Sequence, residues 1–248
     1  MIKEAINRIL ELGVPNIYDG ENGRFSDKEL FRIDKELRAA SIKMNTLTSL
    51  VQYIKSNSAE FKEGNYIVQV VSPTDVRLIS SLDADRKREV LVEVEAELPS
   101  FPFNKAVPHQ EFLIGVQSKF FDNDAEANNK AEANDKALIL KFAGTVKSGT
   151  IANYKDDGVS QKATIKTGVA SLSEAEVPSP CRLKPFRTFL EVDQPISSFI
   201  FRLDENSAGV TCALYEADGG AWKNVAKGNV KAFLEEELGE MNNIIVIS

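Results

Sequence analysis

Apolar residues recur at helical spacing in the first quarter of the chain. The spacing predicts a helix over residues 2–12, with four apolar positions on one face: Ile2, Ile6, Ile9 and Leu10. Residues 26–29 read Ser-Asp-Lys-Glu, a capping box that predicts a second helix, and a third is predicted to begin near Thr46. We therefore expect a helical N-terminal arm over residues 1–45 and a main domain over residues 46–248.

From Tyr66 onward the pattern changes to that of β-strands. Residues 66–71 are rich in β-branched side chains, and a second short strand is predicted over 76–79. Residues 89–98 alternate apolar side chains with glutamates, the period of a strand with one face in the core and one in water. The pattern of residues 112–121 fits a helix or a strand and does not decide between them.

The second half of the chain is also predicted to be rich in strands. Residues 138–142 open it, and the turn sequence Asp156-Asp157-Gly158 predicts a hairpin between two strands. The strands predicted here are 138–142, 151–154, 159–167, 183–190, 198–203 and 211–215. A turn at Asp218-Gly219-Gly220 then precedes an amphipathic helix ending near Leu238.

The last apolar residues, 244–247, indicate a buried terminal strand, because four large apolar side chains in a row would otherwise form an aggregation-prone edge. The alternative is an apolar tail that binds a partner. The fold class that follows is α+β. It has a helical N-terminal quarter, an antiparallel β-rich middle and C-terminal half, and an amphipathic helix near the C-terminus.

One stretch has low sequence complexity. Residues 125–130 read AEANNK and are repeated almost unchanged at 131–136 as AEANDK. We interpret residues 122–136 as a duplicated surface insertion that the fold tolerates. The alternative interpretation is a mobile binding loop.

Composition and charge narrow the class of protein. The 248 residues are 43% hydrophobic and 27% charged, as in an ordinary globular protein. No apolar run approaches the roughly 20 residues that span a bilayer, and residues 1–8 do not resemble a secretion signal, so we expect a cytoplasmic protein without a membrane partner. A net charge of −7 makes nucleic acid an improbable partner. The two cysteines are expected to be buried free thiols.

The sequence contains no recognisable catalytic set and implies no cofactor. The single histidine, His109, would have to serve any Ser-His-Asp triad and most zinc sites, but its neighbours carry no partner signature. Residues 144–150 have the glycine spacing of a phosphate-binding loop, yet Thr150 stands where the essential lysine belongs. We expect both to be ordinary structural residues.

Several carboxylates form an alternative metal site. Glu93 and Glu95, with Glu97, share one face of the alternating strand, and carboxylate oxygens bind divalent cations. Asp156 and Asp157 join them only if the fold brings these distant residues together. A solvated strand face and an ordinary turn are the preferred interpretations, so no metal site is assigned.

The segment 178–195 combines prolines, aromatic residues and charges. Arg187, Glu191 and Asp193 are candidate binding residues within it, able to form an ion-pair lattice or to bind an anion. Because arginine is suited to paired contacts with carboxylates, we expect Arg187 to bind Glu191, Asp193 or a carboxylate on a neighbouring strand or subunit.

Five motifs occur in a fixed order along the chain. They are TLTSLVQYI at 46–54, VSPTDV at 71–76, DDGVSQ at 156–161, KPFRTFLEVDQP at 184–195 and EADGGAW at 216–222. Together they resemble the YfdQ-like family of bacteriophage and prophage proteins, in the form found in phages of Gram-positive bacteria. The resemblance covers roughly residues 46–238. It implies a phage or prophage origin and the cytoplasm of an infected or lysogenic bacterium, and it implies no catalytic residue.

These observations favour a phage or prophage accessory protein that acts without catalysis. It would work by self-assembly, as a homo-oligomer, or by binding a host factor or a small ligand. One alternative is a Mg²⁺-dependent enzyme or accessory factor of nucleic-acid or nucleotide processing. A second alternative is a counter-defence protein that sequesters a host immune factor.

Overall fold

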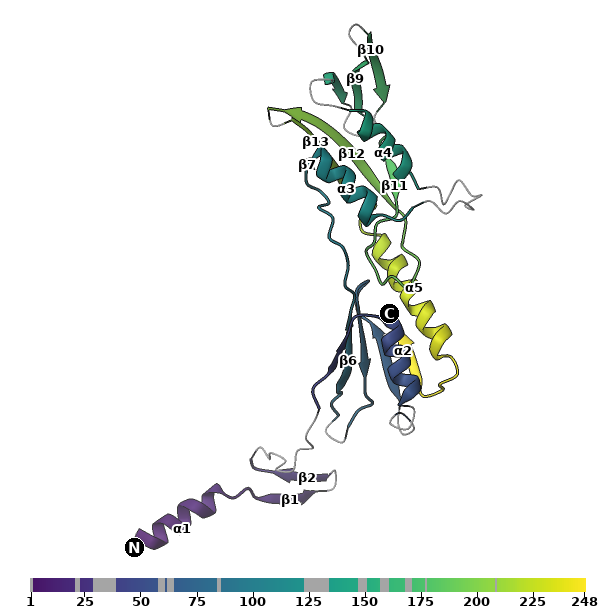
Figure 1. The fold of residues 1–248 in the computed structure, drawn as a ribbon. Coiled ribbons are helices and arrows are strands. Elements are labelled where there is room, and N and C mark those ends of the chain that lie inside the picture. Colours follow the sequence, from purple (N-terminus) through teal and green to yellow (C-terminus); the bar gives the residue numbers. More distant parts are fainter. Residues whose placement is uncertain are drawn as a thin grey trace. The chain divides into compact units, whose positions relative to one another are not determined.

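The structure is a computed structural model, and the residues that it describes fall into two compact units, 1–39 and 40–248. The described residues are 2–20, 23–28, 39–57, 61, 65–83, 86–122, 134–146, 151–156, 161–167, 171–176, 178–207 and 209–248. The boundary between the units lies before residue 45 because strand β3 (Ile42–Met44) pairs with the main sheet of the second unit. Helices and strands are mixed, so the predicted α+β class is confirmed (Figure 1).

The first unit holds one helix and a hairpin. Helix α1 (Ile2–Gly13) is followed by the antiparallel strands β1 (Ile17–Gly20) and β2 (Gly23–Ser26). The N-terminal arm predicted to be helical thus begins with a helix and, in its described part, also contains a hairpin. The Ser26 hydroxyl accepts a hydrogen bond from the backbone N–H of Lys28, 3.2 Å away, so it caps a turn after a strand. The helix predicted to follow falls mostly on residues 29–38, outside the described part of the chain.

The largest sheet of the second unit has the strand order β14-β4-β5-β6-β3. Its four further strands are β4 (Tyr66–Val70), β5 (Asp75–Ile79), β6 (Val90–Glu95) and β14 (Ile244–Ile247). The three central strands are antiparallel, but β14 runs parallel to β4 and β3 runs parallel to β6. The β-rich part is thus mixed rather than purely antiparallel, because both edge strands arrive from distant parts of the chain.

Two helices cover one face of this sheet (Figure 1). They are α2 (Leu47–Ser56) and α5 (Trp222–Leu238). Thr46 caps α2, since its side chain accepts a hydrogen bond from the Ser49 N–H at 3.2 Å. Buried side chains at three- and four-residue spacing face the alternating inward residues of the strands. These helix residues are Leu47, Leu50, Val51, Ile54, Val230, Leu234 and Leu238.

A second core lies against a four-stranded sheet of order β11-β12-β13-β7. Its elements are β11 (Cys181–Leu183), β12 (Ser197–Asn206), β13 (Gly209–Glu216), β7 (Val107–Pro108), α3 (His109–Lys119) and α4 (Lys136–Thr145). Aromatic rings fill it, and Phe112 stacks on Phe201 with ring centroids 5.3 Å apart. Gly115 of α3 lets the helix approach Phe101, because a Cβ there would lie 3.0 Å from that ring.

Two predicted strands are not strands. Residues 138–142 lie inside α4, where Ile139 and Ala143 are buried one turn apart. A short apolar run fits a buried helix as well as a strand, and the contacts of α4 with α3 decide between them. The strand predicted over 183–190 ends at Leu183, and an irregular segment follows. The undecided stretch 112–121 is mainly helix α3.

A further antiparallel sheet has the order β10-β9-β8. Its strands are β8 (Ile151–Asp156), β9 (Gln161–Thr167) and β10 (Ser171–Glu176). The pairing of β8 with β9 is the hairpin that the sequence predicts. The turn residues 157–160, Asp157 among them, lie outside the described residues.

The C-terminal end of the proposed insertion is packed into the fold. Lys136 is only 3% exposed, and its ammonium group donates to the carbonyls of Gln117 and Phe120 at 3.0 and 2.7 Å, which end α3. The Asn134 side chain donates to the Phe121 carbonyl at 2.8 Å. An insertion that extends to residue 136 is therefore too long. Residues 123–133 lie outside the described part.

In the described part of the chain, no helix has the length and apolar character needed to cross a membrane.

Candidate functional site

The irregular segment after β11 is held in place by one side chain. Gln194 is buried, and its carbonyl oxygen accepts hydrogen bonds from the backbone N–H groups of Arg187 and Thr188 at 2.9 and 3.2 Å. Its amide group donates to the carbonyl of Phe189 at 2.9 Å. These bonds satisfy buried backbone groups that a strand ladder would otherwise satisfy. The segment can therefore leave the sheet without unpaired polar groups.

The same segment presents Arg187, a buried charge with 8% of its surface exposed. Its Nη1 lies 2.5 Å from Oε1 of Glu216, and its Nη2 donates to the Ser197 hydroxyl. The guanidinium carbon lies 4.0 Å from the centre of the Trp222 ring, a stacking contact. Arg187, Ser197, Glu216 and Trp222 form what we call the Arg187 cluster.

Burial and charge act on Arg187 in opposite directions. Burial lowers the pKa of the guanidinium from its ordinary value, while Glu216 and Asp218 raise it. The guanidinium stays protonated at neutral pH because its ordinary pKa lies so far above 7. The Nε atom is buried and has no hydrogen-bond acceptor among the described residues. Arg187 is therefore a buried cation with one carboxylate partner, Glu216, and one N–H group, at Nε, that lacks an acceptor within the described part of the chain.

The three binding residues that the sequence suggested do not come together. Arg187 binds Glu216 on the neighbouring strand β13 rather than Glu191 or Asp193. Glu191 accepts a hydrogen bond from the Thr48 N–H at the start of α2, at 3.3 Å. Asp193 lies 2.5 Å from the Lys184 ammonium and is mostly exposed. The sequence also missed Ser197 and Trp222, because no local pattern reveals which strands will be neighbours.

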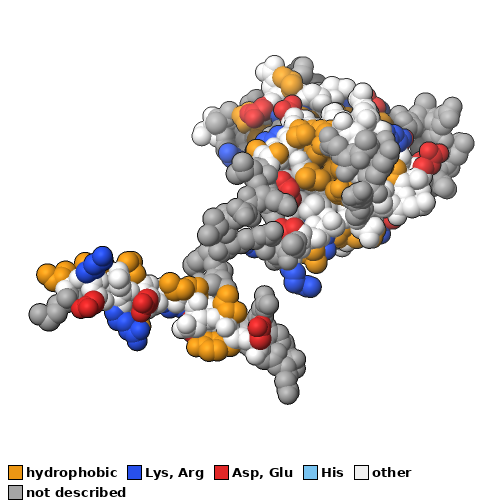
Figure 2. All heavy atoms as spheres, turned by 90° about the horizontal axis from the view of Figure 1, so that it is seen from below, with side chains coloured by type: hydrophobic (Ala, Val, Ile, Leu, Met, Phe, Trp, Pro, Cys, Tyr) orange, Lys and Arg blue, Asp and Glu red, His pale blue; other side chains and the backbone are white. Residues whose placement is uncertain are grey.

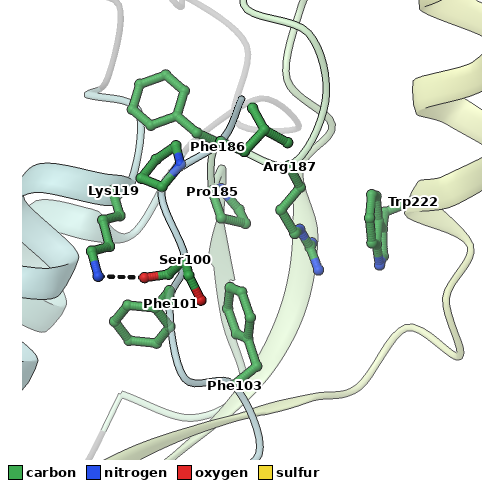
Figure 3. Close-up of a pocket in the computed structure, with 10 residues that line it drawn as sticks. Ser100, Phe101, Phe103, Lys119, Pro185, Phe186, Arg187 and Trp222 are labelled. Atoms are coloured by element: carbon green, nitrogen blue, oxygen red, sulfur yellow. Dashed lines mark hydrogen bonds between the residues drawn. The ribbon is translucent and has the colours of Figure 1, made fainter. Parts of the chain in front are cut away.

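A pocket of about 330 Å³ opens beside the Arg187 cluster. Its walls come from residues 98–103, residues 185–187, Lys119 at the end of α3 and Trp222 at the start of α5. Figure 3 shows Phe103 and Trp222 on either side of the Arg187 side chain. The Lys119 side chain points toward Ser100 in the same view. The Lys119 ammonium donates to the Ser100 carbonyl. The pocket is thus mainly aromatic, with two cations in its wall.

Four of the five motifs that carry the family resemblance meet at this segment. Arg187, in the fourth motif, contacts Glu216 and Trp222 of the fifth motif, at 216–222. The Thr188 hydroxyl donates to the Pro73 carbonyl at 2.6 Å, and Glu191 reaches the motif at 46–54. Residues 157–160 of the remaining motif lie outside the described residues. Residues of these motifs therefore pack against one another in the fold. Such packing accounts for their occurring together without any reference to chemistry.

The carboxylates of the alternative metal site do not come together in the described part of the structure. Glu93 of β6 stands in register between Arg77 of β5 and Lys43 of β3, so two cations flank it across the strands. The β8 strand that ends at Asp156 belongs to a different sheet. Among the described residues, no three His, Cys, Asp or Glu side chains are grouped closely enough to hold a metal ion.

The remaining candidates have structural contacts. Nε2 of His109 lies 2.7 Å from the Ala143 carbonyl, so the ring joins the start of α3 to the end of α4. Gly144 and Thr145 end α4, and residues 147–150 lie outside the described residues. Cys181 and Cys212 are buried free thiols, and burial raises the pKa of each to about 12.

A different kind of surface lies on the N-terminal unit. Every apolar side chain of α1 is exposed, from Ile6 at 51% to Ile2 at 80%, and no residue of the helix is buried. Figure 2 shows these hydrophobic side chains on the surface of the unit, next to charged ones. We call the face made by Ile2, Ile6, Ile9 and Leu10 the α1 apolar face.

Comparison of the chain with protein-family models, with curated proteins and with solved structures finds no match. The resemblance to the YfdQ-like family therefore rests on its motifs alone.

Proposed function

We propose that this protein acts without catalysis and self-associates through its N-terminal unit. The observation that carries this proposal is the fully exposed α1 apolar face. A helix of 12 residues is marginal alone in water, and so is a two-stranded hairpin. These are the elements of the unit's described residues, and a partner surface would supply burial that stabilises them. A second copy of the chain is a suitable partner, because it is always present at the same concentration.

The pattern on α1 suits such an interface. Ile2, Ile6, Ile9 and Gly13 follow one another at spacings of four, three and four residues, as in the seam of a helical pair. The charged side chains lie on the opposite face, where Arg8 and Glu11 form an ion pair with N···O at 3.1 Å. Two such helices can bury their apolar faces against each other and leave their charges in water.

The motif resemblance supports a phage or prophage accessory role for this assembly, in the cytoplasm of an infected or lysogenic bacterium. The Arg187 cluster does not favour a catalytic role, because its guanidinium is held by Glu216 and Ser197. The counter-defence alternative differs in its partner, which would be a host protein instead of a second copy.

Light scattering during size-exclusion chromatography tests the proposal. The intact chain should show a mass of at least two copies at micromolar concentration, and Ile9→Glu should shift it toward one copy by placing a charge in the apolar seam. Asn7→Glu is the matched control, since it adds the same charge on the polar face of α1 and should leave the mass unchanged. A monomeric intact chain would overturn self-association, and a host protein then captured through α1 would favour the sequestration alternative.

A further inference from the structure

The pocket beside the Arg187 cluster has walls suited to a flat ring. Phe101 and Phe103 lie with ring centroids 4.9 Å apart, and Phe103 stacks on Phe199 at 5.4 Å with an angle of 16° between the rings. Trp222 closes the other side and is half-buried. The Arg187 guanidinium fills the space between Phe103 and Trp222, so a planar aromatic group would gain its ring contacts beside the guanidinium, against the phenylalanine wall.

The walls are formed before any ligand binds. The Asn104 N–H donates to the Leu214 carbonyl at 2.8 Å, and its side chain accepts from the Glu216 N–H at 3.0 Å, which holds the end of the 98–103 segment. Gln194 holds the opposite segment through its three backbone carbonyl contacts. A preformed wall reduces the ordering cost that a ligand must overcome.

The charge of the pocket is positive. Glu216 neutralises Arg187, but Lys119 makes no ion pair with any carboxylate in the described part of the chain. The Lys119 ammonium has three donors and gives one to the Ser100 carbonyl. These features together favour a negatively charged group in the pocket.

We propose that this pocket binds a small molecule that combines a flat aromatic ring with one anionic group. The ring packs against the aromatic wall at Phe103, beside the Arg187 guanidinium that separates Phe103 from Trp222. The anionic group meets the ammonium of Lys119. The volume of about 330 Å³ is at the small end of ligand sites, which suits a single ring system and not a polymer. Both a nucleoside monophosphate and an aromatic carboxylate have this chemistry. The site is independent of the proposed self-association.

Tryptophan fluorescence gives a direct test, because Trp222 is the only tryptophan of the chain. Adenosine 5′-monophosphate and phenylacetate are titrated into the intact protein with excitation at the red edge of tryptophan absorption. At least one should cause a saturable change, and their relative affinities distinguish a nucleotide from a carboxylate source. Adenosine, which lacks the phosphate, and inorganic phosphate, which lacks the ring, should each bind with an affinity at least about tenfold lower.

Lys119→Gln tests the anion contact. The glutamine amide keeps a donor for the Ser100 carbonyl, so folding is preserved, and affinity should fall about tenfold. Lys141→Gln, on the exposed side of α4, is the matched control and should bind as the unaltered chain. The proposal is overturned by the lack of a saturable response to both aromatic anions, by adenosine or phosphate binding as well as the combined molecule, or by undiminished affinity in Lys119→Gln. The same titration on Ile9→Glu separates ligand binding from assembly.

Discussion

Arg187 is a buried cation whose environment distinguishes it from the other charged residues of the described chain. Its ion pair with Glu216 is largely enclosed, whereas the pair of Lys184 with Asp193 has one partner in solvent. An enclosed pair leaves an uncompensated charge when one partner is removed, while an exposed pair is screened by water. The two pairs therefore differ in what they contribute to stability.

Replacement of Arg187 by lysine should be nearly as harmful as replacement by alanine. A lysine ammonium is a single point that cannot reach both Glu216 and Ser197 and cannot stack on Trp222 as a plane. We expect each change to lower the free energy of unfolding by about 3 kcal/mol in urea denaturation. Asp193→Asn is the contrast, with a loss below about 1 kcal/mol. Tolerance of Arg187→Lys would show that the pairing and stacking contribute little.

Asp27 makes the first unit sensitive to acid. Hydrogen bonds from the side chain and backbone of Asn16, at 2.7 and 2.8 Å, lower the pKa of its carboxyl group below the ordinary value of 3.8. A lowered pKa in the folded state means that the carboxylate stabilises the unit above about pH 4 and that this contribution is lost as the pH falls through the lower value.

The Asp27 carboxyl should accordingly titrate below its ordinary pKa in an NMR pH series. Asn16→Ala should return the pKa toward 3.8, since it removes the largest cause of the shift. Amide exchange near residue 16 should accelerate in the same pH range. A carboxyl that titrates normally in the unaltered chain would show that this contact between the two ends of the hairpin does not persist in solution.

At the scale of elements, the end of the low-complexity stretch is structural and its middle is not required by any described contact. Asn134 and Lys136 hold the end of α3, and the Asp135 carboxylate accepts a hydrogen bond from the Arg182 N–H at 2.7 Å. The same three residues lead directly into α4. The functional boundary of the insertion thus lies near residue 133.

Deletion of residues 123–133, bridged by two glycines, should leave the melting temperature within a few degrees. The deleted composition has little apolar surface to bury. Extending the deletion through Asp135 should lower the melting temperature by about 5 °C or more, because hydrogen bonds at the ends of α3 and β11 are lost. Equal melting temperatures for the two deletions would show that residues 134 and 135 do not anchor the segment.

The terminal strand β14 is only half buried, and this corrects the expectation that all four of its apolar residues are enclosed. Ile244 and Val246 face the core, while Ile245 and Ile247 are 52% and 41% exposed. The side chains alternate because strand residues point to opposite faces of a sheet. An apolar run of four therefore cannot be buried on a sheet with only one covered face.

Truncation after Asn243 should lower the free energy of unfolding by about 3 kcal/mol, the contribution of two partly buried side chains and a strand ladder. Within the intact chain, Val246→Ala should be clearly destabilising. Ile245→Ser, on the outward face, should cost less than about half as much. Chemical denaturation measures all three, and equal losses for the two substitutions would contradict this orientation of the strand.

At the scale of the whole molecule, the two units have different physical characters. The second unit holds both hydrophobic cores, and none of their residues belongs to the first. The first unit has exposed apolar side chains and no buried residue in its helix. The second unit therefore has the cores that can stabilise it, and the described part of the first unit has no comparable core.

Removal of residues 1–39 should leave the melting temperature of the remainder within a few degrees. The scattering mass should fall to that of one copy if the first unit supplies the self-association interface. A large loss of stability would show that the first unit contributes to the core of the second. Preserved assembly would place the interface elsewhere on residues 40–248.

The sequence by itself determined the elements whose side chains repeat with a clear period. The alternation in 89–98 predicts β6, the capped apolar pattern from Thr46 predicts α2, and the 151–167 turn pattern predicts the β8–β9 hairpin. Such periods reflect which face of one element is buried, and that information is local. The exposed α1 face is also visible in the sequence, although only the structure shows that the described chain leaves it uncovered.

Only the tertiary structure decided what distant segments do together. Residues 138–142 became helix through packing on α3, and the parallel pairing of β14 with β4 joins residues far apart in the chain. The choice of Glu216 over Glu191 and Asp193 as the partner of Arg187 has the same origin. Each of these depends on which elements are neighbours in space, and the free energy of burying a side chain depends on neighbours that no local pattern encodes.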